Sequence, residues 1–146
     1  KLNNFFIFLH TEYVYTNEFS FFLKPSEHGV GVFAAHNIKR GAKLRLFGDT
    51  DPIQKLKRED VPGRFRTYCP DFGDFLLCPT DFGYMPIGWY LNHSDSPNAL
   101  RDAKKSGKYG MYLTAAHNIS EGDEITIDYN CLGEPEIYKA KFFRKK

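Results

Sequence analysis

The segment YLNHSDSPN, at Tyr90–Asn98, is followed downstream by EITIDYN, at Glu124–Asn130, and these two stretches carry the most information in the chain. Both are dense in polar and aromatic side chains, and both adjoin a β-type run. The triplet Asn-His-Ser stands between the apolar run 85–91 and a Pro-Asn turn, and Tyr129 ends an alternating strand. We interpret the two segments as the two halves of one reaction site.

The composition is that of an ordinary globular protein. A chain of 146 residues fits one domain with one compact core, which buries roughly 70% of the surface that the unfolded chain exposes. Hydrophobic residues make up 42% and charged residues 26%, with 14 Phe and 9 Tyr, and this composition argues against disorder. The net charge of +2 is too small to indicate a nucleic-acid partner.

Cysteine use and hydropathy favour an intracellular, reducing compartment. Cys69, Cys78 and Cys131 form no CxxC pair, and their odd number leaves a free thiol in any disulfide scheme. No apolar run approaches the roughly 20 residues of a membrane span, and the aromatic start of the chain is too short for a secretory signal. The basic tail at residues 139–146 is either a solvated end or a contact for an acidic partner.

Short β-like runs, punctuated by Gly, Pro, Asn and Asp, fill the chain, and no long amphipathic helix stands out. One short helix is expected, at Lys55–Asp60. The pattern predicts a mostly-β domain, and the connections are too short to mark a domain boundary. The expected strands are Phe5–Leu9, Tyr13–Tyr15, Phe21–Leu23, Gly31–Ala35, Lys43–Phe47, Phe75–Cys78, Met111–Ala115 and Ile125–Tyr129.

The chain contains one internal repeat. VFAAHNIKRGAKLRLF at Val32–Phe47 matches LTAAHNISEGDEITID at Leu113–Asp128, with AAHNI identical and Gly41 opposite Gly122. Each copy predicts a strand, an Asn-containing turn, a glycine free to take positive φ, and a second strand. We therefore expect two related hairpins packed in one core.

Several familiar sites are disfavoured. The GxG at 29–31 lacks the third glycine and the helix of a dinucleotide site, so it is an ordinary turn or one whose bare backbone approaches a ligand. Ser94 cannot present its hydroxyl to the adjacent His93, and no GxSxG elbow exists, which disfavours a hydrolase. The two Asp-Phe-Gly triplets are predicted turns because no kinase HRD loop accompanies them. His36 and His117 are predicted turn residues, and no zinc-ligand spacing is present.

HGVGVFA at His28–Ala34, YLNHSDSPN and EITIDY occur in this order, and the combination resembles the SET-domain protein lysine methyltransferases. Each piece alone is modest, whereas all three at family-like separations are strong. The resemblance covers residues 20–130 and implies a SET-domain fold of several small β-sheets with little helix and a knot-like crossing of the NHS and DY segments. Residues 1–19 are then N-terminal aromatic strands packed on the domain, and residues 131–146 a basic C-terminal segment.

The resemblance also implies S-adenosyl-L-methionine as the cofactor and Tyr129 as the catalytic residue, standing where the methyl group passes to the target nitrogen. Asn92 by its side chain and His93 by its backbone would hold the amino-acid end and the adenine. An amide both donates and accepts hydrogen bonds, which suits a zwitterionic ligand. The residues implied for cofactor binding are His28, Gly29, Val30, Gly31, Asn92 and His93.

The implied chemistry needs alignment and desolvation more than charged side chains. The cofactor brings an activated methyl group, and the protein supplies positioning. The target lysine must react as a neutral amine, although its reference pKa of about 10.4 leaves only about one molecule in a thousand neutral near pH 7. An apolar aromatic channel beside the sulfonium would lower that pKa. Candidates for this channel, with plain core as the alternative for each, are Tyr68, Phe72, Tyr84, Trp89 and Tyr90.

Two positions depart from the family pattern. Asp95 stands where many relatives carry a zinc-binding cysteine, and no cysteine cluster follows Tyr129, so no metal is expected. Another element must then close the lysine channel. Ile127 stands where relatives often carry Phe or Tyr, and this smaller side chain suggests room for multiple methylation. The candidates for closing the channel are Tyr138, Phe142 and Phe143.

The expected function is methyl transfer from S-adenosyl-L-methionine to the side-chain amine of a protein lysine. A histone tail is the commonest substrate that the resemblance implies, and it would place the protein in the nucleus; another protein substrate would place it in the cytoplasm. The first alternative is a non-catalytic SET-like interaction module that keeps cofactor binding, and the second is a structural protein without a cofactor. Asn92, His93 and Tyr129 argue against the first alternative.

Overall fold

The computed structural model describes residues 15–16, 20–47, 53–106, 111–133 and 135 of the chain. The strand expected at Phe5–Leu9 lies outside the described residues, as do most of the one at Tyr13–Tyr15 and the basic tail. Within the described part, no helix is long and apolar enough to cross a membrane.

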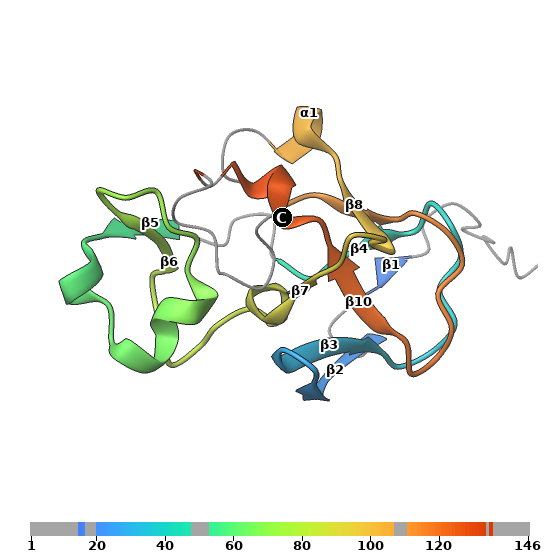
Figure 1. Cartoon of the computed structure of the whole chain (residues 1–146). Helices are drawn as coiled ribbons and strands as arrows, with labels where there is room; N and C mark the ends of the chain where they lie inside the picture. The colour runs from blue at the N-terminus through green and yellow to red at the C-terminus, as the bar shows by residue number, and fades with distance from the viewer. Residues whose placement is uncertain (1–14, 17–19, 48–52, 107–110, 134, 136–146) are drawn as a thin grey trace, which may run out of the picture.

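The described chain is mostly β, as the sequence predicted, and its strands form three small sheets (Figure 1). One four-stranded sheet has the order β1-β4-β9-β8, another the order β2-β3-β10-β7, and β5 pairs with β6. The strands are β1 (Tyr15–Thr16), β2 (Phe21–Ser26), β3 (Gly29–Ala34), β4 (Lys43–Leu44), β5 (Ile53–Leu56), β6 (Leu76–Pro79), β7 (Asn92–His93), β8 (Ala99–Arg101), β9 (Leu113–Ala115) and β10 (Glu124–Ile127). The helical elements are α1 (Ala103–Ser106) and the 3₁₀ helices Arg58–Asp60, Gly63–Tyr68, Ile87–Tyr90 and Tyr129–Leu132.

Most expected strands within the described residues are present, but the helix predicted at Lys55–Asp60 is wrong. Lys55 and Leu56 end β5, and their register partners on β6 are Leu77 and Leu76. Only Arg58–Asp60 is helical, as a single 3₁₀ turn. The pairing with β6 overrides the helix propensity of a lysine-rich and glutamate-containing segment.

β2 and β3 form a tight hairpin whose turn is set by one glycine. Ser26 pairs with Gly29 in the register, so only Glu27 and His28 lie between the strands. Gly29 has φ +106°, a left-handed conformation that side chains disfavour. β3 then runs between β2 and β10 and is buried from Gly31 to its end.

The two copies of the repeat do not form self-contained hairpins, which corrects the prediction. β3, the first strand of copy one, pairs antiparallel with β10, the second strand of copy two. β9 and β4 pair in the same way. The pattern of one copy is compatible with pairing inside the copy or between copies, and burial of Ile38 and Ile119 where the two copies meet favours the exchange.

The repeat turns meet in a nearly symmetric contact. Ile38 and Ile119 exchange backbone hydrogen bonds of 2.8 and 2.9 Å, and both side chains are buried. The glycine after each turn takes a left-handed conformation, with φ +82° at Gly41 and +84° at Gly122. Each of these glycines donates its N–H to an alanine carbonyl of the other copy at 2.8 Å. The two copies therefore form one frame.

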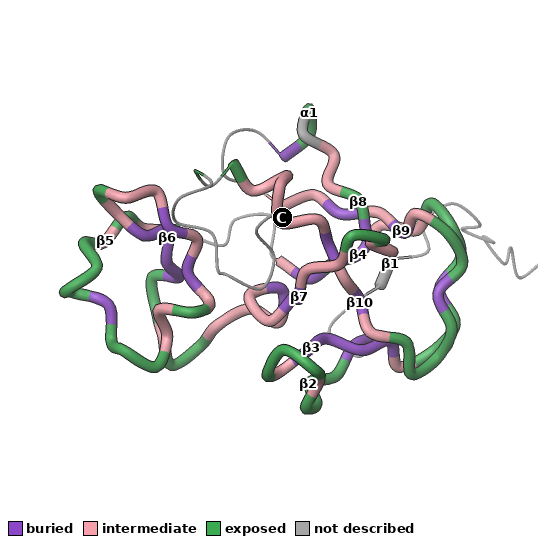
Figure 2. Tube along the Cα trace, viewed as in Figure 1, coloured by how far each residue is buried: buried purple, intermediate pink, exposed green. Residues whose placement is uncertain are grey.

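The buried hydrophobic residues form two clusters, not the single core expected from the length. The main core is formed by buried residues from strands of both four-stranded sheets and from the segments that connect them (Figure 2). A satellite unit, defined here as residues 53–82, has its own small cluster and lies to one side in Figure 1. Its apolar side chains pack locally because β5, β6 and the intervening 3₁₀ helices are contiguous in sequence. The cluster consists of Val61, Cys69, Leu76 and Cys78, with Leu56, Phe65 and Phe82 packed against it.

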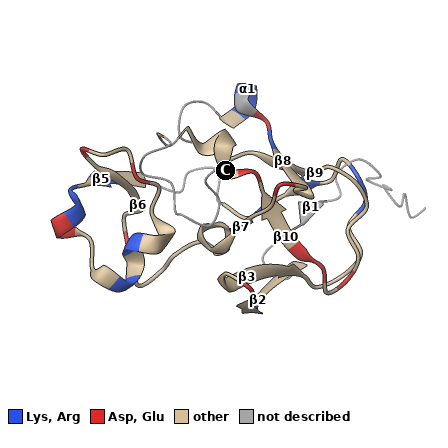
Figure 3. Ribbon diagram, in the orientation of Figure 1, with Lys and Arg blue, Asp and Glu red and all other residues tan. Residues whose placement is uncertain are grey.

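Charge is distributed differently over the two regions. In the satellite unit, the 3₁₀ helix Gly63–Tyr68 carries two arginines, and Arg58–Asp60 carries one arginine and two acidic residues, whereas acidic side chains mark both ends of β10 (Figure 3). In the satellite unit Arg58 forms an ion pair with the buried Asp71. Burial raises the pKa of the Cys69 and Cys78 thiols, so both stay protonated at neutral pH.

Candidate functional site

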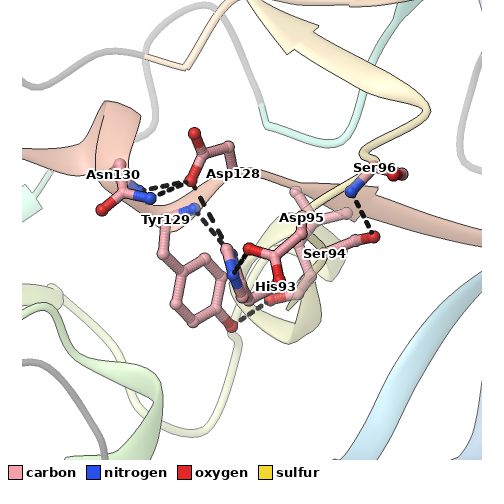
Figure 4. Close-up of polar contacts among 8 residues, drawn as sticks. His93, Ser94, Asp95, Ser96, Asp128, Tyr129 and Asn130 are labelled. Atoms are coloured by element: carbon pink, nitrogen blue, oxygen red, sulfur yellow. Dashed lines mark hydrogen bonds and ion pairs between the residues drawn. The ribbon is translucent and has the colours of Figure 1, made fainter. Parts of the chain in front are cut away.

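The two motif segments lie side by side in the structure. β7 and β10 are parallel neighbours, with Asn92 opposite Thr126 and His93 opposite Ile127. The backbone N–H of Ser94 extends this pairing by donating to the carbonyl of Ile127 at 3.0 Å. Polar side chains of both segments converge where these strands end (Figure 4). The threading of one segment through the other stays a prediction.

Asn98, the last residue of YLNHSDSPN, holds β10 from the side and was not singled out from the sequence. Its side-chain Nδ2 donates to the carbonyl of Glu124 at 2.7 Å, and its Oδ1 accepts from the N–H of Thr126 at 2.9 Å. The amide thus copies the two bonds of a neighbouring strand. The preceding proline in the motif is a signal for such a fixed turn, although it does not indicate the partner.

Asn92 has a buried side chain whose amide nitrogen is engaged by the protein. Nδ2 lies 2.7 Å from Oε1 of Glu124, 2.8 Å from Oγ of Ser26 and 3.3 Å from the carbonyl oxygen of Val30. The side chain is part of a residue that is 9% exposed. These contacts connect Asn92 to the β2–β3 hairpin, so the structure brings together this predicted cofactor residue and the glycine segment.

The glycine segment 28–31 has two different glycine requirements. Gly29 supplies the left-handed turn described above, and His28 beside it is exposed, with its N–H directed at Oγ of Ser26 at 3.3 Å. Gly31 is buried, and a Cβ there would lie 2.2 Å from Oε1 of Glu124. The backbone of Gly31, which the sequence analysis expected close to a ligand, therefore lies close to the Glu124 carboxylate.

Tyr129 is fixed at both ends. Its hydroxyl donates to the carbonyl of Leu91 at 2.6 Å, and its backbone N–H donates to Nδ1 of His93 at 3.1 Å. The ring lies 5.4 Å from the His93 ring, centroid to centroid (Figure 4). All three contacts come from the segment that contains β7, so the aromatic residue of EITIDYN is held directly against YLNHSDSPN.

The ring of His93 stands between two carboxylates. Because Nδ1 accepts the N–H of Tyr129, the neutral ring carries its hydrogen on Nε2. Nε2 lies 3.3 Å from Oδ1 of Asp95, and Nδ1 lies 3.8 Å from Oδ1 of Asp128 (Figure 4). The His93 side chain therefore orients Tyr129, a role that the sequence did not predict, because the prediction concerned only its backbone.

Asp128 follows the end of β10, which comes two residues earlier than predicted. Its Oδ1 accepts from the N–H of Asn130 at 2.9 Å and from the side-chain amide of Asn130 at 2.6 Å. This carboxylate caps the 3₁₀ helix Tyr129–Leu132, so the strand expected at Ile125–Tyr129 stops at Ile127. The cap turns Tyr129 out of the strand direction and toward Leu91.

The five aromatic candidates for the lysine channel do not form one cluster. Tyr68 lies against Tyr90 at 5.0 Å between ring centroids, and Tyr90 directly precedes Leu91. Phe72 stacks on Phe75 in the satellite unit, and Trp89 lies against Phe47. Tyr84 is 81% exposed. Of the five, the pair Tyr68–Tyr90 is connected to Tyr129, because Leu91, the residue after Tyr90, accepts the hydrogen bond of the Tyr129 hydroxyl. The three candidates for closing the channel, at 138–143, lie outside the described residues.

The two departures from the family pattern have different surroundings. The Asp95 side chain is 95% exposed and faces His93. Ile127 is 3% exposed and packs in the main core. Among the described residues, no group of three or more His, Cys, Asp or Glu side chains is arranged to hold a metal ion.

Comparison with known proteins identifies a family and a fold. The sequence profile of the SET domain matches residues 29–130. No curated protein sequence matches the chain. Among solved structures, a candidate histone methyltransferase of Plasmodium falciparum is 26% identical with a TM-score of 0.47, over 77% of this chain and 95% of that chain. The methyltransferase domain of human PR domain-containing protein 2 is 22% identical with a TM-score of 0.46, over 75% of this chain and 76% of that one.

A third solved structure contains ligands. KRYPTONITE, in complex with mCHH DNA, an H3(1–15) peptide and SAH, is 21% identical with a TM-score of 0.50. The match covers 76% of this chain but 23% of that chain. At this level of identity the likeness concerns the fold.

Proposed function

This chain belongs to the SET-domain family, and from that premise we propose that it is a protein-lysine N-methyltransferase that uses S-adenosyl-L-methionine. The observation that carries the proposal is the fixed position of Tyr129, held by Leu91 and His93 on the strand next to Asn92. A tyrosine anchored at both its hydroxyl and its backbone suits a reaction that depends on alignment.

The chemistry of the donor set fits the proposed cofactor. The amide nitrogen of Asn92 faces Glu124, Ser26 and Val30, so its Oδ1 is the atom that suits a positively charged group such as an α-ammonium. Gly29 and Val30 offer backbone groups at the same hairpin, beside His28. S-adenosyl-L-methionine, when bound, supplies a methyl group activated by its sulfonium.

Tyr129 would assist the transfer through its oxygen. The hydroxyl hydrogen is directed at the carbonyl of Leu91, so toward other groups the oxygen acts as an acceptor. An acceptor in that position stabilises a polarised methyl group through weak CH···O contacts. Tyr68 and Tyr90 would exclude water from the approaching lysine, and desolvation lowers the pKa of an ammonium and favours the reactive neutral amine.

The non-catalytic interaction module remains the alternative, and a cofactor assay with an activity assay separates the two. S-adenosylhomocysteine should raise the melting temperature in both cases by mass action. Only the enzyme transfers labelled methyl groups to histones or to proteins of a lysate. Histones are the first substrate to test because the KRYPTONITE structure contains an H3 peptide together with SAH.

Tyr129→Phe is the decisive variant. Loss of the hydroxyl should lower the methyl-transfer rate by about tenfold or more, which corresponds to the loss of one hydrogen bond that acts in the transition state. Tyr112→Phe is the matched control because the Tyr112 hydroxyl bonds Lys43, away from the site. Undiminished transfer by Tyr129→Phe would refute the catalytic role, and absence of transfer by the native chain on both substrate pools would favour the interaction module.

The number of methyl groups added is a separate question at the same site. We propose that more than one is added, from the absence of a larger aromatic residue at Ile127, and a product analysis by mass spectrometry tests this. Monomethyl-lysine as the sole product would contradict it.

A further inference from the structure

We propose that Glu124 is a positioning residue that orients the amide of Asn92. Through this amide, the cofactor site binds ligands that carry an amino-acid end more tightly than ligands that lack one. The inference rests on the proposed function and deepens it, because Glu124 lies inside EITIDY and inside the family match but the resemblance implies no role for it. Glu124 begins β10, five residues before Tyr129.

The contacts of Asn92 fix which way its amide points. A carboxylate oxygen of Glu124 lies 2.7 Å and the carbonyl oxygen of Val30 lies 3.3 Å from the same side-chain atom. Both are acceptors, so that atom must be the nitrogen. The Glu124 contact is the shorter and the charge-assisted one, so it is the stronger restraint on the rotation.

The chain makes specific room for the Glu124 carboxylate. A Cβ at Gly31 would lie 2.2 Å from Oε1 and 2.9 Å from Cδ of Glu124, distances that are too short for real atoms. Gly31 is buried and belongs to β3, the neighbour of β10. A glycine at this position therefore serves the approach of Glu124, and through it the orientation of Asn92.

Glu124 comes from a rigid piece of backbone. Asn98 bonds its carbonyl at 2.7 Å, and Phe33 is its register partner on β3. A side chain that leaves a strand held on both sides presents its carboxylate in one place, which is what orientation of a ligand-binding amide requires. Asn92 is itself buried, so its amide has little freedom apart from a flip.

The test compares ligands that differ only at the amino-acid end. We expect Glu124→Ala to weaken binding of S-adenosylhomocysteine by at least about tenfold, the size of a lost charge-assisted hydrogen bond. Binding of 5′-methylthioadenosine, which lacks the amino-acid end, should change by less than about threefold on the same grounds. Calorimetry measures both. Glu121→Ala, an exposed glutamate in the turn before β10, is the matched control and should bind both ligands like the native chain.

Two conservative variants separate the effect of side-chain length at position 124 from the effect of its charge. Both can be measured even if Glu124→Ala impairs folding. Glu124→Gln keeps an acceptor at the same distance and should retain binding within about threefold. Glu124→Asp keeps the charge but withdraws the acceptor by one methylene and should behave like alanine. The opposite order would overturn the proposal because it would assign the effect to charge alone.

Gly31→Ala provides a second route to the same conclusion. It should weaken S-adenosylhomocysteine binding in the native background but add little in Glu124→Ala, because the two changes remove one interaction. Additive effects, or equal losses for both ligands, would overturn the positioning role. Failure of the native chain to bind S-adenosylhomocysteine would instead refute the proposed function, so the two failures are distinguishable.

Discussion

The two copies of the repeat pair in the same way, but they differ at a pair of facing positions, one inside each copy and one directly before it. In one half, Nζ of Lys43 lies 3.9 Å from the ring centroid of Tyr112 and donates to its hydroxyl. In the other half, Glu124 takes the place of Lys43 and Gly31 takes the place of Tyr112. The space that a tyrosine ring fills in one half is thus left to a carboxylate and the Asn92 amide in the other. The candidate site therefore lies in the half of the molecule where glycine replaces the tyrosine.

Removal of the central isoleucines tests whether the two halves are equal as scaffolds. Ile38→Ala and Ile119→Ala should each lower the free energy of unfolding by about 2–5 kcal/mol because each empties a buried position. The two side chains are 2% and 1% exposed and their backbones are bonded to each other. Urea unfolding measures the losses. A neutral result for one of them would mean that the halves are not equivalent.

Exchange of Gly31 and Tyr112 tests whether the glycine in one half is required for ligand binding. Gly31→Tyr should abolish the rise in melting temperature caused by S-adenosylhomocysteine, because any Cβ at this position displaces Glu124. Tyr112→Gly should keep that rise while it lowers stability by about 1–3 kcal/mol through lost packing. Thermal melts with and without ligand provide both values. Retained ligand response in Gly31→Tyr would contradict the comparison.

The turn asparagines allow the finest test of symmetry. Oδ1 of Asn37 accepts from the N–H of Glu121 and Oδ1 of Asn118 accepts from the N–H of Arg40, each at 2.9 Å. Asn37→Ala and Asn118→Ala should each cost about 1 kcal/mol, the typical net value of one hydrogen bond. Denaturant midpoints measured on both variants would show whether the costs match; a difference above about 1 kcal/mol would break the symmetry.

Many of the strands could be predicted from the sequence because they depend on local signals, whereas the approach of the two motifs was predicted from the family resemblance. Alternation at Ile125–Ile127 and the glycine at 29 act within a few residues. The resemblance then assigned both motifs to one site, and β7 and β10 are indeed neighbours. The family match over residues 29–130 agrees with the resemblance.

The hydrogen-bond partners inside the site could not be predicted because they depend on register between distant strands. Glu124 and Asn92 are 32 residues apart, and nothing local indicates that one orients the other. The pairing of strands between the two copies of the repeat could not be predicted either, because it also depends on distant segments. The segment at Lys55 favours a helix locally, whereas the structure pairs Lys55 and Leu56 with Leu77 and Leu76, which lie 22 and 20 residues further along the chain.

The exchanged pairing also determines when the protein can fold. β3 pairs with β10 and β4 with β9, so neither copy completes its pairing until the second copy has been synthesised. Contacts that close such long loops come late and slow the folding reaction. In the satellite unit, β5 can pair with β6 as soon as residues 53–79 have been synthesised. During synthesis the first copy therefore emerges with unpaired strand edges, and this interval is when the nascent chain is most exposed to aggregation.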